Sequence, residues 1–133
     1  MSAHTAKELS PVLFLPHGGG PLPLLGDKSH ESLITFLKNI PLRLGTPDVI
    51  LLISAHWEEK NPTLTGSEAP ALIYDYYGFP DEAYQLQYAA EGRPKLAKEI
   101  KDLFESSGIR TSINQQRGYD HGMYVPLLLM YPL

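Results

Sequence analysis

Residues 48–54, with the sequence DVILLIS, carry the strongest fold signal in this chain. They are aliphatic and β-branched without polar alternation, which is typical of a strand buried on both faces of a sheet. Residues 11–15 form a second continuous apolar run and predict another buried strand. Between the two runs, apolar residues at helical spacing predict a helix over residues 29–40. Strand, crossover helix and strand form a βαβ unit, so we expect an α/β fold with a central, mostly parallel sheet flanked by helices.

Further elements are expected downstream. Residues 93–106 predict a second helix, because Pro94 suits the first helical position and Gly108 suits the end. Short strands are expected at residues 62–65, 84–88 and 109–113. The last residues, 125–133, form an apolar element without a polar finish, which predicts an exposed apolar patch and an apparently truncated domain. We expect residues 1–10 to form a tail and residues 11–133 to form one domain.

The composition excludes several classes of function. The chain has 133 residues, a hydrophobic content of 43% and a net charge of −4, and its basic residues are scattered, which argues against nucleic acid as a partner. It contains no cysteine, so disulfides, thiolate metal sites and cysteine nucleophiles are excluded. The first residues lack the apolar core of a secretory signal, and no apolar run is long enough to cross a bilayer. We therefore expect a cytoplasmic protein with no membrane partner.

Two histidines follow the two predicted strands. His17 lies in LPHGGG and His56 lies in ISAHW. The carboxyl ends of neighbouring parallel strands lie at one edge of a sheet, so both imidazoles can converge on one metal ion, with Fe(II) or Zn(II) suiting neutral imidazole. Each histidine, taken alone, is also compatible with a structural turn. Two ligands leave at least a third to be supplied by histidine or a carboxylate.

A third histidine and an aromatic loop complete the set of candidate residues. His121, in the sequence YDHG, is a candidate general acid and base, although a loop histidine without a role has the same pattern. The loop 73–80, IYDYYGFP, contains aromatic rings that suit a pocket for a planar substrate, and these rings equally suit packing beneath a loop. The candidate pocket residues are Tyr74, Tyr77, Phe79 and, beside His56, Trp57.

Other polar residues receive weaker predictions. Asp75 is a candidate acceptor for an imidazole N–H. His4 and His30 are expected to be exposed and without a role. The HGGG string can also supply the oxyanion-hole amides of an esterase, but that chemistry needs a G-x-S-x-G nucleophile elbow, and the chain has none.

Four strings occur here in a fixed order: LPHGGGP, ISAHWE, IYDYYGFP and RGYDHGMYVPLLLMYP. Together they resemble the class III extradiol ring-cleavage dioxygenases, which include the LigB-like proteins and the 4,5-DOPA dioxygenase branch. The resemblance covers residues 11–132 and implies the N-terminal part of a catalytic domain. It implies that His17 and His56 are the first two metal ligands, that His121 is the acid and base, and that the substrates are O2 and a catechol such as DOPA.

The chain also departs from that family. Family members are longer, and their third metal ligand lies in a C-terminal segment for which this chain has no matching residue. Gly19 stands where many members have serine. Three hypotheses follow: an extradiol dioxygenase with Fe(II) or Zn(II), a catalytically inactive binding or regulatory module, and a metal-dependent hydrolase. For the second, we expect a homo-oligomer or pairing with a full-length homologue.

Overall fold

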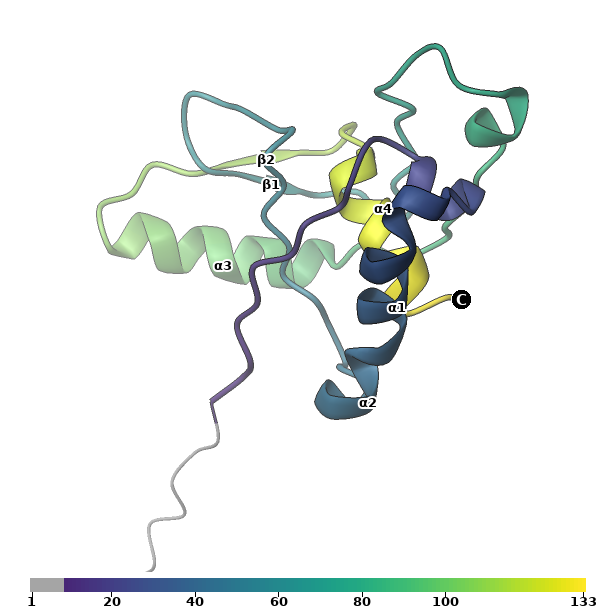
Figure 1. The fold of residues 1–133 in the computed structure, drawn as a ribbon. Helices are drawn as coiled ribbons and strands as arrows, with labels where there is room; N and C mark the ends of the chain where they lie inside the picture. Colours follow the sequence, from purple (N-terminus) through teal and green to yellow (C-terminus); the bar gives the residue numbers. More distant parts are fainter. Residues whose placement is uncertain (1–8) are drawn as a thin grey trace, which may run out of the picture.

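The computed structural model describes residues 9–133, so most of the predicted tail at residues 1–10 lies outside the described residues. Figure 1 shows α1 beside α4, and α3 running along the two strands. The helices are α1 (Glu31–Asn39), α2 (Pro41–Leu44), α3 (Pro94–Ser106) and α4 (His121–Met130), and the strands are β1 (Thr63–Thr65) and β2 (Ser112–Asn114). Short 3-10 helices occupy Leu22–Leu25, Lys28–His30 and Asp81–Tyr84.

Helix α4 forms the centre of the core. Its residues Tyr124, Val125 and Leu127 are buried together with Leu37 of α1 and Tyr88. A helix that is apolar on all sides is stable only when other elements cover it, and α1 lies against it here. The expectation that residues 125–133 leave an exposed apolar patch was therefore wrong for the helix, although the final Leu133 is exposed.

The two strands form a parallel pair. The register joins Thr63 to Ser112, Leu64 to Ile113 and Thr65 to Asn114. Helix α3 lies between the strands in sequence and packs against both, so these elements form a βαβ unit. The predicted helices at 29–40 and 93–106 and the predicted strand at 62–65 are confirmed, and the strand expected at 109–113 begins at Ser112.

The predicted strands at 11–15 and 48–54 are wrong for the described residues. Neither segment joins a sheet, and residues 11–15 and 48–53 make no backbone–backbone hydrogen bond within residues 9–133. Most of their apolar side chains face solvent, with Phe14 99% and Ile53 92% exposed, while Leu15 and Leu52 pack against the core. An apolar pattern indicates only that a segment suits a sheet, because a strand also needs a partner edge. The sheet of the described chain is therefore two-stranded rather than central and extended.

The predicted strand at 84–88 is also wrong. Its first residue ends the 3-10 helix Asp81–Tyr84, and the remainder is irregular. The alternation of the sequence here has a different cause, because Leu86 and Tyr88 face the core while Gln85 and Gln87 face solvent. Within residues 9–133, no helix has the length and apolar character that a membrane crossing requires.

We expect Leu37→Ala to destabilise the chain by about 2–5 kcal/mol, because the Leu37 side chain is fully buried between α1 and α4 and its loss leaves a cavity. Phe36→Ala is the matched control, since the neighbouring Phe36 is 47% exposed. Urea denaturation measures both values. Equal losses of stability in the two variants would contradict the placement of the core.

Candidate metal centre

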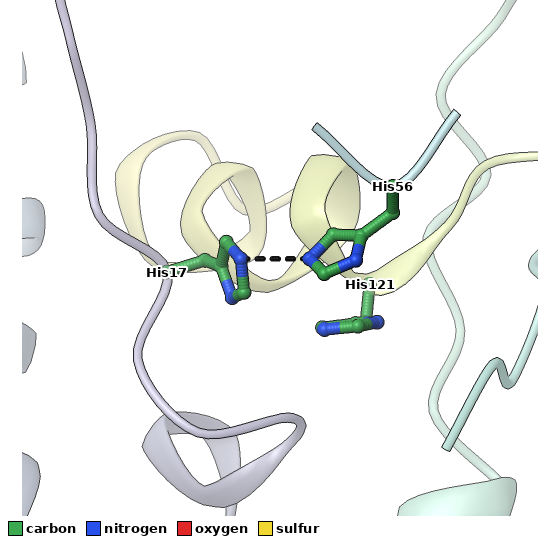
Figure 2. Close-up of side chains that lie close together, drawn as sticks. All are labelled: His17, His56 and His121. Atoms are coloured by element: carbon green, nitrogen blue, oxygen red, sulfur yellow. Dashed lines mark hydrogen bonds between the residues drawn. The ribbon is translucent and has the colours of Figure 1, made fainter. Parts of the chain in front are cut away.

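Three histidines from three separate segments meet at one point (Figure 2). His17 follows the segment 11–16, His56 lies in the turn after residues 48–54, and His121 is the first residue of α4. One imidazole nitrogen from each lies within 4.8 Å of the others. The Nε2 atoms of His17 and His56 are 2.9 Å apart. The structure thus brings together the two predicted ligands and the predicted acid and base.

The carboxylate of Asp120 fixes two of these segments to each other. Oδ1 accepts a hydrogen bond from the Ser54 hydroxyl at 2.8 Å and another from the Met123 backbone N–H at 3.3 Å, which caps α4. The Ser54 hydroxyl oxygen in turn accepts the backbone N–H of His56 at 3.2 Å. One buried carboxylate therefore sets the start of α4 and the turn that carries His56.

Gly122 allows His56 to approach α4 closely. A Cβ atom at this position would lie 2.7 Å from Cδ2 of His56 and 3.0 Å from the Ser54 hydroxyl. Any larger residue would have to displace the imidazole or the serine. The glycine of the DHG string is therefore required by the contact between His56 and α4.

Asp75 orients the His121 imidazole through a hydrogen bond at Nδ1. Its Oδ1 accepts hydrogen bonds from the ring Nδ1 at 2.8 Å and from the His121 backbone N–H at 3.0 Å. Burial alone would raise the pKa of the Asp75 carboxyl, but the hydrogen bonds from His121 outweigh it and lower that pKa. Because the carboxylate can only accept, Nδ1 carries the proton and Nε2 of the neutral ring keeps its lone pair. The prediction that Asp75 accepts an imidazole N–H is confirmed.

The surroundings of His17 favour its neutral imidazole. Burial lowers the pKa of His17, and the neighbouring His121 and His56 lower it further because their positive charges would repel one another. The Nδ1 atom of His17 is buried and has no hydrogen-bond partner among the described residues. Neutral imidazole is the form that binds metal ions, and a nitrogen-only donor set without thiolates suits Fe(II) or Zn(II). The residues present therefore fit a divalent metal ion.

The predicted pocket residues take different positions. The Tyr77 side chain is 92% exposed. Tyr74 faces the core and donates its hydroxyl to the Leu86 carbonyl. Phe79 packs against Tyr76, with ring centroids 5.4 Å apart. It also lies over Gly20 of the glycine turn, which is formed by residues 18–20 after His17. Phe79 thus contacts the turn that follows His17.

Trp57 directly follows His56 in the chain. Its indole N–H donates to Glu59 at 3.0 Å, and the Arg117 guanidinium lies 5.2 Å from the ring centroid. Arg117 also pairs with Asp120 at 3.2 Å. Sequence reasoning missed Arg117, which is close to Asp120 in sequence, and Ser54, which only the fold brings to this carboxylate.

Sequence comparisons relate the chain to known proteins. Residues 11–133 match the family model described as the catalytic LigB subunit of aromatic ring-opening dioxygenase. The chain is 48% identical to dioxygenase tasH of Hapsidospora irregularis over 98% of this chain and 43% of the relative. It is 47% identical to a 4,5-DOPA dioxygenase extradiol of Beta vulgaris over 91% of this chain and 45% of the relative. A 4,5-DOPA dioxygenase extradiol of Escherichia coli K12 is 34% identical over 92% of this chain and 43% of the relative.

The match extends over nearly all of this chain, and the chain spans less than half the length of these relatives. The matched range contains all three clustered histidines. The chain therefore belongs to the LigB family of aromatic ring-opening dioxygenases.

Proposed function

We propose that this chain takes part in extradiol ring opening of a catechol such as DOPA by O2, with His17 and His56 as metal ligands and His121 as acid and base. The observation that carries the proposal is the convergence of three imidazoles, one of which has its Nδ1 held by Asp75. Relatives named dioxygenases favour ring opening over metal-dependent hydrolysis.

The proposed roles differ among the three histidines. His17 and His56 would hold the metal, and a bound Fe(II) would supply a redox-active centre for O2 and the catechol, whereas Zn(II) would bind without redox chemistry. Nε2 of His121 would accept the proton of a catechol hydroxyl. Asp75 would stabilise the resulting imidazolium through Nδ1, and Nε2 would later return the proton to the opening ring. Phe79, beside the turn after His17, and Trp57, next to His56, are our proposed lining of the substrate pocket.

We expect the purified chain to bind Fe(II) under anaerobic conditions, with His17→Ala and His56→Ala weakening the affinity by more than about a hundredfold. Removing a residue that merely supports a ligand already costs about 10–100-fold, so losing the ligand itself costs more. Calorimetric titration measures the affinity, and His4→Ala is the histidine control. Binding that survives in both cluster variants would contradict the proposed ligand set.

The role of His121 can be separated from metal binding. If it is the acid and base, His121→Ala keeps the metal affinity within a few-fold but lowers turnover by about 10²–10⁴-fold. Turnover is followed as O2 uptake together with the absorbance of the ring-opened semialdehyde from DOPA. Asp75→Asn should lower turnover as well, because it removes the charge that stabilises the imidazolium. A loss of metal affinity equal to that of His17→Ala would instead make His121 a third ligand.

A second candidate function, a binding module, is favoured by the exposed apolar segments. Residues 11–15 and 48–53 present unpaired backbone groups together with exposed side chains such as Val12 and Ile53. Unpaired extended backbone with apolar side chains tends to pair with another chain. We propose that a second copy of this chain is the partner, since each copy offers two such segments for reciprocal pairing.

We expect light scattering at micromolar concentration to give the mass of a dimer, with Ile53→Lys shifting it to the monomer because a charge cannot be buried at the pairing edge. Leu42→Lys on α2 is the matched control, as Leu42 is also exposed, at 83%, but lies outside both segments. A monomeric wild-type chain at every concentration would contradict self-association.

A further inference from the structure

His30, which the sequence predicts to be exposed and without a role, lies against the glycine turn that follows His17. Its Nε2 accepts the backbone N–H of Gly19 at 3.0 Å. Its Nδ1 lies 2.7 Å from the Asp27 carboxylate. Because the carboxylate can only accept, Nδ1 donates and Nε2 is left free to accept from Gly19. Both ring nitrogens are therefore engaged, and the His30 side chain is only 18% exposed.

Asp27 is itself held in place. The Ser29 hydroxyl donates to the same carboxylate oxygen that His30 contacts. These hydrogen bonds, from Ser29 first and then from His30, lower the pKa of Asp27. The carboxylate therefore stays charged and fixes the tautomer of the His30 ring.

The backbone of the glycine turn approaches the His30 ring closely. Gly18 has a φ of +78°, and a Cβ atom there would lie 2.6 Å from Cδ2 of His30. On the neighbouring side, a Cβ on Gly20 would lie 3.1 Å from the Phe79 ring. The turn thus lies against two aromatic side chains, His30 and Phe79, and the His30 ring also accepts one of its backbone N–H groups.

We propose that His30 is a positioning residue that holds the glycine turn and, through it, the His17 imidazole in place for metal binding. The inference rests on the proposed function, in which His17 is a ligand. A glycine-rich turn has high conformational freedom in the absence of such a contact. Its fixation keeps Nε2 of His17 near Nε2 of His56, 2.9 Å away, before any metal arrives.

The test uses His30→Phe, which keeps a ring against Gly18 but removes both nitrogens, and His30→Gln, which keeps an acceptor. Lys28→Ala, on the same 3-10 helix and exposed, is the control. Zn(II) affinity is measured by competition with a chromophoric chelator. Exchange of the Gly19 amide proton is measured by NMR without metal, and the thermal midpoint reports folding.

We expect His30→Phe to weaken Zn(II) binding about tenfold and to speed Gly19 exchange up to about tenfold, with little change in the thermal midpoint. His30→Gln should restore much of both, and Lys28→Ala should change neither. Wild-type affinity and exchange in His30→Phe would overturn the proposal.

The two proposals fail differently. If the wild-type chain binds no metal, the proposed function fails, and the positioning role is judged on the exchange of Gly19 alone. Faster exchange in His30→Phe then supports the contact between His30 and the turn, and unchanged exchange overturns it.

Discussion

The buried carboxylate of Asp120 is the interaction on which the site depends. A carboxylate that is only 3% exposed is tolerated only when its oxygens are paired, and here the partners are the distant Ser54 and two residues close in sequence to Asp120. Ser54 brings the turn of His56, Met123 brings the first turn of α4, and Arg117 contributes the countercharge. The need to satisfy one carboxylate therefore holds together the segments that carry two of the three histidines.

Two other carboxylates each orient an imidazole by accepting its Nδ1–H. Asp75 accepts from Nδ1 of His121, and Asp27 accepts from Nδ1 of His30. In both cases the carboxylate fixes which nitrogen carries the proton and aims Nε2 at its target. For His121 the target is the histidine cluster, and for His30 it is the backbone of the glycine turn. The orientation of the His121 ring is thus set by a carboxylate from a distant segment, and that of the His30 ring by a carboxylate three residues away. The position of His17 depends on the glycine turn that follows it.

The described chain also has two unlike apolar regions. Helix α4 is covered by α1 and the aromatic loop, with the Tyr124 hydroxyl donating to Tyr76 at 3.0 Å. Residues 11–15 and 48–53, which lead to His17 and His56, expose most of their apolar side chains, although Leu15 and Leu52 pack against the core. The exposed apolar side chains therefore include those of the two segments that precede His17 and His56.

Local pattern determined α1, α3 and β1, because helical spacing, proline and glycine placement and β-branched residues act within a few neighbours. It also singled out His17, His56 and His121, because their strings are local. Tertiary structure decided the rest. The apolar runs at 11–15 and 48–54 lack a partner edge within residues 9–133, which no local pattern reveals. The Asp120 network and the hydrogen bond from Gly19 to His30 join residues 66 and 11 positions apart, so only the folded chain brings them together.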